Sequence, residues 1–191
     1  RPHGARRAAV EAALASLPGQ AFPSIHLAGY AVLAGTEAGL QGLLQRLPQV
    51  QLGGTLYPFR LLRHGPYHTP LLAPAAAEAR RSFAGLGWRR PHTTLIDGRG
   101  RRSGPLASDP RALFEYTVGA QVTTPYDLSA SLRVLLLEHA PAQIYLPGPG
   151  NTLGGVLGQA LIAAGWRGIR GKADFQRAQE SQSPPVVSMR R

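Results

Sequence analysis

The chain has 191 residues, of which 43% are hydrophobic, and a net charge of +11 without any cysteine. The missing cysteine excludes disulfides, thiolate metal sites and a cysteine nucleophile, and it fits a reducing compartment, so we expect a cytoplasmic protein. No apolar run reaches the roughly 20 residues of a membrane span, and we therefore expect a soluble globular protein with no membrane partner.

The positive charge is spread along the whole chain. All but one of the 21 basic residues are Arg, and only Arg99, Arg101 and Arg102 form a local cluster. A nucleic-acid-binding domain concentrates its basic residues on one face and carries a recognition motif, neither of which the pattern predicts here. We therefore expect no nucleic-acid partner, and dispersed Arg suits an acidic protein or a phosphorylated small molecule better.

The first 62 residues predict a small α/β unit. Residues 6–17 have Ala and Leu at helical spacing, and residues 23–35 suggest two short strands joined at Gly29. Thr36 then predicts the start of a helix that runs to Leu47, and residues 53–62 predict a third strand. The order helix, strand, strand, helix, strand resembles a ferredoxin-like fold without its first strand, so we assign residues 1–62 to a ferredoxin-like small subdomain.

Residues 63–171 predict alternating helices and strands. Helices are expected over 71–87, from Pro110 to about Gly119, over 129–139 and over 148–165, with strands at 92–97 and 142–146. Such alternation favours parallel strands in an α/β sheet. The remaining residues, 172–191, are polar and contain a double proline, and we expect a tail that is either loosely held or docked late.

His68 is the first candidate for a catalytic residue. It follows Gly65, Pro66 and Tyr67 on a turn between a predicted strand and a predicted helix. Such a turn fixes the ring through the backbone, as a general base requires, although a structural histidine fits the same pattern. His64 suggests a metal pair with His68, but the intervening Gly-Pro prevents the helix that such a pair needs, so we expect no metal.

Two further segments could carry chemistry. Gln121 is expected just past a helix end, where it could hold an imidazole in one tautomer or be an ordinary loop amide. The turn at 148–150 could hold a phosphate at a helix start or be purely structural. A dinucleotide site is excluded because Leu153 stands where the fingerprint requires a third glycine.

A serine nucleophile is not predicted within these residues. The sequence contains no Gly-x-Ser-x-Gly elbow. The serines, among them Ser24, Ser103 and Ser129, are expected in loops or caps rather than on the strand–turn–helix frame that exposes a nucleophile.

Read together, these segments resemble the second half of the malonyl-CoA:acyl carrier protein transacylase family, the acyltransferases of fatty-acid and polyketide synthesis. GPYHTPLLAPAA at 65–76 is similar to the family's GPFHSPLMKPAA, and LIDGR at 95–99 resembles its NVDARP. AQVTTPYDLSASLRVLL at 120–136 is similar to RQVTSPVRWEESVRYLL, and IYLPGPGNTLGGVL at 144–157 to FVEVGPGKVLSGLI. Residues 25–44 resemble the family's small ferredoxin-like subdomain.

The resemblance implies a fold and a mechanism. The fold is α/β, with residues 63–171 as the C-terminal part of a hydrolase-like large subdomain beside the ferredoxin-like small one. His68 would be the catalytic base and Gln121 would brace it through its backbone carbonyl. A serine would carry malonyl from malonyl-CoA to the phosphopantetheine thiol of acyl carrier protein in ping-pong fashion, without a cofactor. Tyr67 would favour malonyl over methylmalonyl.

The family's serine elbow precedes the region of resemblance. The chain opens without methionine, so we expect a further segment upstream that carries the serine, and we expect the 191 residues alone to be inactive. The alternative is a non-catalytic acyltransferase-like module that binds a carrier or synthase partner. A third hypothesis, a basic nucleic-acid-binding protein, depends on the net charge alone.

Overall fold

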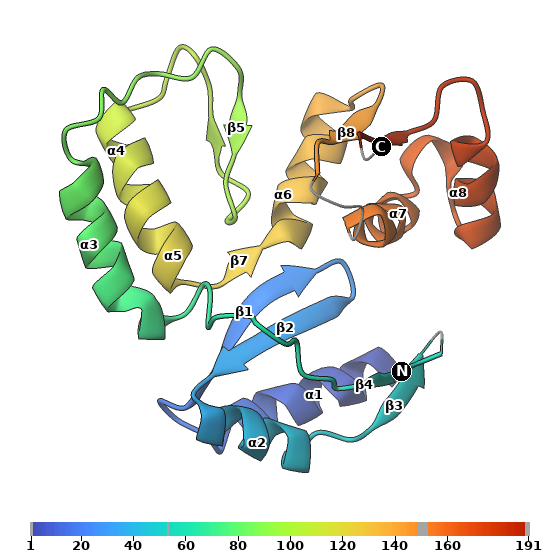
Figure 1. Cartoon of the computed structure of the whole chain (residues 1–191). Helices are drawn as coiled ribbons and strands as arrows, with labels where there is room; N and C mark the ends of the chain where they lie inside the picture. Colours follow the sequence, from blue (N-terminus) through green and yellow to red (C-terminus); the bar gives the residue numbers. More distant parts are fainter. Residues whose placement is uncertain (1, 53, 149–152, 190–191) are drawn as a thin grey trace. The chain divides into compact units, whose positions relative to one another are not determined.

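The computed structural model describes residues 2–52, 54–148 and 153–189 (Figure 1). The fold is mixed α/β and divides into two compact units. Unit 1 contains Arg1–Ile25, Ala31–Trp88 and Arg111–Pro125, and unit 2 contains His26–Tyr30, Arg89–Pro110 and Tyr126–Arg191. Within the described ranges, no helix is both long and apolar enough to cross a membrane.

The chain begins with the predicted helix, two strands and helix, which belong to unit 1 except for the tip of the hairpin, His26–Tyr30. These are α1 (Pro2–Ala15), β1 (Ala21–Leu27), β2 (Tyr30–Gly35) and α2 (Glu37–Arg46). The Thr36 hydroxyl caps α2 by accepting from the N–H of Gly39 at 3.1 Å, as the sequence predicts.

A small apolar core joins these elements of unit 1. It contains the buried side chains of Ala13, Leu17, Ala21 and Leu43. Gly42 allows α2 to approach Leu17, because a Cβ at this position would lie 2.8 Å from Cδ2 of Leu17. The small residues at helical spacing therefore set how closely α2 packs on this core.

The strand predicted at 53–62 is wrong in its extent. The structure has a hairpin instead, with β3 (Val50–Leu52) antiparallel to β4 (Thr55–Tyr57). Gly54, with φ +82°, makes the tight turn between them, and Pro58 has no N–H with which to continue β4. Residues 58–69 then run without strand structure to a single turn of 3₁₀ helix at Pro70–Leu72.

Two helical segments of unit 1 lie side by side (Figure 1). One is α3 (Ala73–Phe83), and the other is formed by α4 (Pro110–Glu115), a π-helical stretch (Tyr116–Ala120) and α5 (Gln121–Thr123). Nε of Arg80 lies 3.1 Å from Oε2 of Glu115 and joins the two. The second segment begins at Pro110 as predicted, but it continues past Gly119, so Gln121 lies in its last turn rather than beyond its end.

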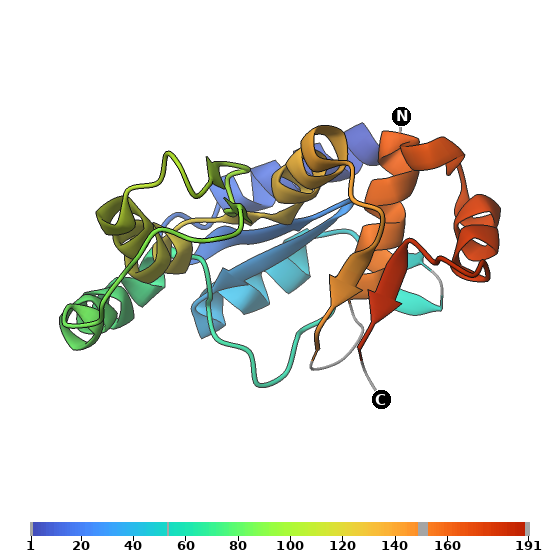
Figure 2. The ribbon, with the colours of Figure 1, turned by 90° about the horizontal axis from the view of Figure 1, so that it is seen from above.

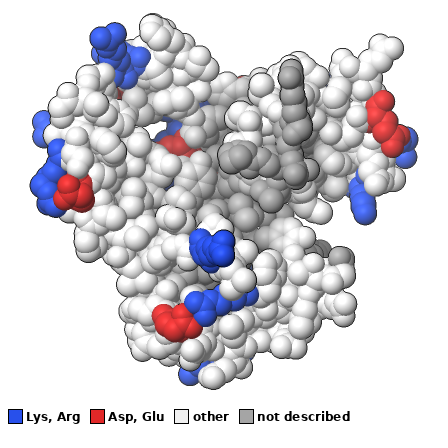
Figure 3. All heavy atoms as spheres, in the orientation of Figure 1, with Lys and Arg blue, Asp and Glu red and all other residues white. Residues whose placement is uncertain are grey.

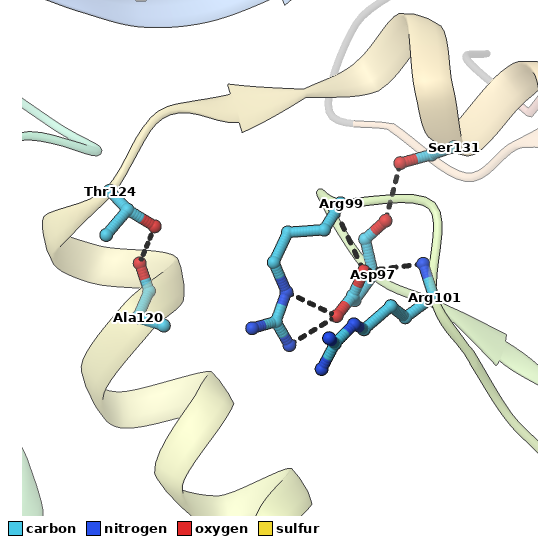
Figure 4. Close-up of polar contacts among 6 residues, drawn as sticks. All are labelled: Asp97, Arg99, Arg101, Ala120, Thr124 and Ser131. Atoms are coloured by element: carbon cyan, nitrogen blue, oxygen red, sulfur yellow. Dashed lines mark hydrogen bonds and ion pairs between the residues drawn. The ribbon is translucent and has the colours of Figure 1, made fainter.

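Unit 2 contains a hairpin closed by one aspartate. Strand β5 (Leu95–Ile96) pairs antiparallel with β6 (Arg102–Ser103). Oδ1 of Asp97 accepts from the N–H groups of Arg99 and Arg101, each at 2.8 Å, and Oδ2 accepts from Nη2 of Arg99 at 2.7 Å (Figure 4). The Ser131 hydroxyl donates to the Asp97 carbonyl at 2.7 Å. Asp97 therefore holds the arginine-containing turn between β5 and β6, a pair of which the sequence predicts only the first strand.

The larger core lies in unit 2. Strand β7 (Tyr126–Asp127) leads into α6 (Leu128–Val134) and a π-helical stretch (Leu135–His139), and α7 (Leu153–Ala164) packs on α6. Leu161 of α7 is fully buried. The buried residues of this core are Leu132, Leu136, Val156, Leu157, Leu161, Trp166, Ile169 and Val186. The predicted turn at 148–150 lies largely outside the described residues.

The segment from Lys172 forms regular structure, so of the two expectations for this tail, loose attachment is wrong and the segment is docked. It contains α8 (Lys172–Gln179) and β9 (Val186–Ser188), which runs parallel to β8 (Ile144–Leu146) (Figure 2). The Gln179 amide holds Val186 with two hydrogen bonds, donating to its carbonyl at 3.0 Å and accepting from its N–H at 2.9 Å. A few apolar side chains in a polar sequence are enough to dock this segment.

The alternating pattern predicts parallel strands, but β5, within the strand predicted at 92–97, pairs antiparallel with β6. Strand β8 does have a parallel partner, β9, which the sequence analysis does not predict. The β3–β4 and β5–β6 pairs are antiparallel because their connections are too short for a crossover. The remaining sheet has the order β2-β1-β7. The turn between β1 and β2 belongs to unit 2. There the N–H of Ala28 donates to the Ser129 hydroxyl at 2.8 Å.

Candidate active site

His68 lies in a turn of unit 1 with an unusual backbone conformation. Its φ is +58°, in the left-handed region that costs most residues about 1–2 kcal/mol. The turn is held by the N–H of Tyr67, which donates to the Gly65 carbonyl at 2.8 Å, and by the Thr69 hydroxyl, which donates to the Pro66 carbonyl at 2.6 Å. The ring position of His68 is therefore determined by the backbone, as the sequence suggests.

The end of the helical segment at Thr123 leaves one carbonyl without its usual donor. The Thr123 hydroxyl donates to the Gly119 carbonyl at 3.1 Å. The Thr124 hydroxyl donates to the Ala120 carbonyl at 2.7 Å (Figure 4). The Gln121 carbonyl would next accept from the backbone nitrogen at position 125, but Pro125 has no N–H. This carbonyl is therefore available to a side chain.

His68 contacts that carbonyl. Its Nδ1 lies 2.5 Å from the backbone oxygen of Gln121. A carbonyl oxygen only accepts, so Nδ1 carries the proton, and in the neutral ring the lone pair is on Nε2. The arrangement thus prepares Nε2 to take a proton from a nearby hydroxyl or thiol, which is the chemistry of a general base.

The structure brings two of the three predicted site residues into contact, namely His68 and Gln121, through the Gln121 backbone. The third, Tyr67, is 52% exposed, and its ring meets the ring of His64 edge to face with centroids 6.2 Å apart. His64 therefore packs against Tyr67, the residue that precedes His68 in the sequence. Among the described residues, no group of three or more His, Asp or Glu could hold a metal ion.

Sequence reasoning missed Ser24. This residue lies inside β1 rather than in a loop or cap, and only 2% of it is exposed. Its hydroxyl donates to the Tyr67 carbonyl at 2.8 Å. The two positions are 43 residues apart, so no local sequence pattern predicts the contact.

The basic side chains of the described residues are dispersed on the face that Figure 3 draws. On the face drawn in Figure 3, Lys and Arg side chains lie in separate places, several of them beside an acidic side chain. In the loop cluster, Arg99 pairs with Asp97 and Arg102 with Glu138. The charge around this loop is therefore partly neutralised within unit 2.

Comparison with known proteins finds similarity in structure only. No family model matches the chain. No curated protein matches it either.

Several solved structures share the fold. An acyl-carrier-protein S-malonyltransferase from Burkholderia pseudomallei has a TM-score of 0.68 at 19% identity, with 97% of this chain and 51% of that chain covered. A malonyl CoA-acyl carrier protein transacylase from Coxiella burnetii has a TM-score of 0.70 at 14% identity, with 96% and 50% covered. A structure of a type II PKS acyl-carrier protein in complex with its malonyl-transacylase has a TM-score of 0.67 at 18% identity, with 81% and 48% covered.

The similarity concerns the fold and part of the length. The chain spans about half of each of these structures. Its fold is therefore that of about half of a malonyl-CoA:acyl carrier protein transacylase, in agreement with the resemblance noted in the sequence.

Proposed function

We propose that this chain supplies the catalytic base of a malonyltransferase, which moves a malonyl group from malonyl-CoA to the phosphopantetheine thiol of an acyl carrier protein. The observation that carries the proposal is the contact between Nδ1 of His68 and the Gln121 carbonyl. The fold shared with malonyltransferases supports the reaction type. In the proposed assignment, residues 1–62 form a ferredoxin-like small subdomain and residues 63–171, which contain His68 and Gln121, form part of a hydrolase-like large one.

In the proposed mechanism, His68 acts in both half-reactions. Nε2 takes the proton of a serine hydroxyl as its oxygen attacks the thioester of malonyl-CoA, and the ring returns this proton to the departing coenzyme A thiolate. In the second half, Nε2 takes the proton of the carrier thiol, whose sulfur attacks the malonyl-serine ester, and the serine oxygen is protonated as it leaves. No cofactor takes part, since malonyl-CoA is a substrate.

The serine is not among these 191 residues in the setting that such a nucleophile requires, because the sequence has no Gly-x-Ser-x-Gly elbow. We propose that the nucleophilic serine belongs to another part of the same polypeptide. The 191 residues by themselves would then not transfer malonyl. Gln121 supports the base by fixing its tautomer, much as a carboxylate does in a serine protease but without adding charge.

Tyr67 is proposed to select the acyl group. It precedes the base directly, and about half of its surface is exposed. A bulky ring beside the reacting centre would leave little room for the 2-methyl branch of methylmalonyl. Excluding one methyl group contributes about 1–3 kcal/mol of discrimination.

An acyl carrier protein is the proposed macromolecular partner. One of the similar structures is a complex of such a carrier with its malonyl-transacylase. Carrier proteins are acidic and coenzyme A bears phosphates, so a chain of net charge +11 would attract both in the cytoplasm.

The test is malonyl transfer by the native polypeptide that contains this chain. The polypeptide is incubated with malonyl-CoA and then with holo acyl carrier protein, and the masses of both proteins are measured after each step. The proposal expects a malonyl adduct first on the polypeptide and then on the carrier. A polypeptide that binds the carrier but never gains the adduct would instead be a non-catalytic module.

A further inference from the structure

A buried hydroxyl from β1 reaches the turn that holds His68. The hydroxyl of Ser24, a residue that is 2% exposed, donates to the carbonyl of Tyr67 at 2.8 Å. We propose that Ser24 is a positioning residue for His68. Its effect on the reaction depends on the function proposed above, whereas its effect on the ring does not.

The connection runs through one peptide group. The Tyr67 carbonyl and the His68 nitrogen belong to the same planar unit, so a hydrogen bond that fixes the oxygen also fixes the orientation of the nitrogen. The orientation of this plane and the φ of His68 place the Cβ from which the ring extends. Since this φ is +58°, the turn needs contacts that hold it against the commoner negative values.

The other side of His68 is held locally. Thr69 is 0% exposed, its hydroxyl donates to the Pro66 carbonyl, and its own carbonyl accepts from the N–H of Leu72 at 3.1 Å. These bonds all lie within the turn and the 3₁₀ helix that follows it. The Ser24 bond differs because it ties the turn to a strand of the sheet.

Removal of the Ser24 hydroxyl would therefore release the plane that precedes His68. Without this hydroxyl the partly buried Tyr67 carbonyl lacks its donor, so the turn would relax toward conformations in which water reaches the Tyr67 oxygen. In those conformations the ring moves away from the Gln121 carbonyl, which lies 2.5 Å from Nδ1 in the held state. The tautomer of His68 would then no longer be fixed.

The first experiment observes the ring in the native polypeptide that contains this chain, with histidine labelled by ¹⁵N and the His68 signals assigned by comparison with His68→Ala. Imidazole nitrogen shifts report the tautomer, and exchange of the Nδ1 proton with water reports its hydrogen bond. We expect Ser24→Ala to give a mixture of tautomers and an Nδ1 proton that exchanges about tenfold faster, the size expected for one lost buried hydrogen bond. Ser24→Thr retains the hydroxyl and should restore the wild-type spectrum.

The matched control is Ser131→Ala. Ser131 is also buried, at 6% exposure, and its hydroxyl donates to the Asp97 carbonyl at 2.7 Å. It has no part in the His68 turn, so its loss should leave the His68 signals unchanged. Wild-type His68 signals in Ser24→Ala, or equal changes in both alanine variants, would overturn the proposal. If Ser24→Ala does not fold, Ser24→Thr and Ser24→Cys, with a weaker donor, decide the question through graded exchange rates.

The second experiment measures malonyl loading of the native polypeptide. Ser24→Ala should lower kcat about tenfold with KM unchanged, because the hydroxyl acts on the base and not on the substrate. A fall in affinity with kcat unchanged would overturn the positioning role. If the wild type does not load malonyl at all while the ring still responds to Ser24→Ala, the proposed function fails and the positioning inference stands.

Discussion

Nδ1 of His68 lies 2.5 Å from the carbonyl oxygen of Gln121, which follows it by 53 positions. The contact exists because the helical segment that contains Gln121 ends before Pro125, which cannot donate to this oxygen. Thr124 is extended, as a residue before proline must be, and it completes the helix end. A proline thus determines which tautomer the candidate base adopts.

Substitution of Pro125 tests this relationship. Pro125→Ala restores an N–H at position 125 and frees Thr124 to become helical, so the Gln121 carbonyl gains a competing donor. We expect malonyl loading to slow by about three- to tenfold, the effect of weakening one hydrogen bond. Gln121→Ala keeps the backbone acceptor and should slow loading less than His68→Ala does. The loading rate is measured from the mass of the polypeptide over time, and circular dichroism reports whether the helix has lengthened. A Pro125→Ala variant with a longer helix and an unchanged loading rate would contradict the role of the carbonyl.

Tyr67 is expected to control the choice of acyl group. Tyr67→Ala should shift the ratio of kcat/KM for malonyl-CoA and methylmalonyl-CoA by about 10- to 200-fold toward the branched substrate. Tyr145→Ala is the control, because Tyr145 is similarly exposed at 58% but lies in unit 2. An unchanged ratio in Tyr67→Ala would remove this residue from the proposed substrate site.

Asp97 should make the stability of the protein depend on acid pH. Burial alone raises the pKa of this carboxyl, but hydrogen bonds from the Arg99 side chain and from the backbone of Arg101 and Arg99 outweigh it and hold the pKa below its usual value. Such a group stabilises the fold fully above its unfolded pKa of about 3.9, and this contribution is lost as the pH falls through the lower folded pKa.

The corresponding variant is Asp97→Asn, which weakens several of these hydrogen bonds. We expect it to lower the free energy of unfolding by roughly 1–3 kcal/mol at pH 7, and the difference from wild type should shrink below about pH 4. Urea denaturation across this pH range measures the difference. Glu78→Gln, which disrupts an exposed pair with Arg81, is the control and should change stability little. A difference that does not depend on pH would contradict the assignment.

The net charge of +11 should affect the encounter with an acidic carrier. Raising the ionic strength shortens the screening length from about 30 Å at 0.01 M to about 8 Å at 0.15 M, so the second-order rate of malonyl transfer to the carrier should fall across this range. Stopped-flow or quenched-flow rates at a series of salt concentrations measure this. A rate that does not change with salt would remove electrostatic steering from the account.

The sequence predicts the helices of the chain better than its strands. Thr36, Pro110 and the apolar spacing of α2, α6 and α7 are local signals, and the structure confirms them. The strand at 53–62 was predicted wrongly because the local turn at Gly54 and the stop at Pro58 were not recognised. The strand at Val186 was not predicted, because it depends on pairing with β8, which is distant in the sequence.

The candidate site could be predicted only in part. The contact of His68 with the Gln121 backbone was expected from the family resemblance, while the local pattern left both residues ambiguous. Pro125 was a usable signal, since a proline after a helix deprives one carbonyl of its donor. Ser24 had no such signal, because its partner is 43 residues away.

The central claim is that His68 is the base of malonyl transfer, and one measurement tests it most directly. The mass of the native polypeptide is followed after addition of malonyl-CoA for wild type, His68→Ala and His92→Ala, the last an exposed histidine of unit 2. The account predicts that wild type and His92→Ala gain one malonyl group at equal rates, and that His68→Ala is slower by about 10²–10⁴-fold. Loading of a folded His68→Ala variant at the wild-type rate would contradict it.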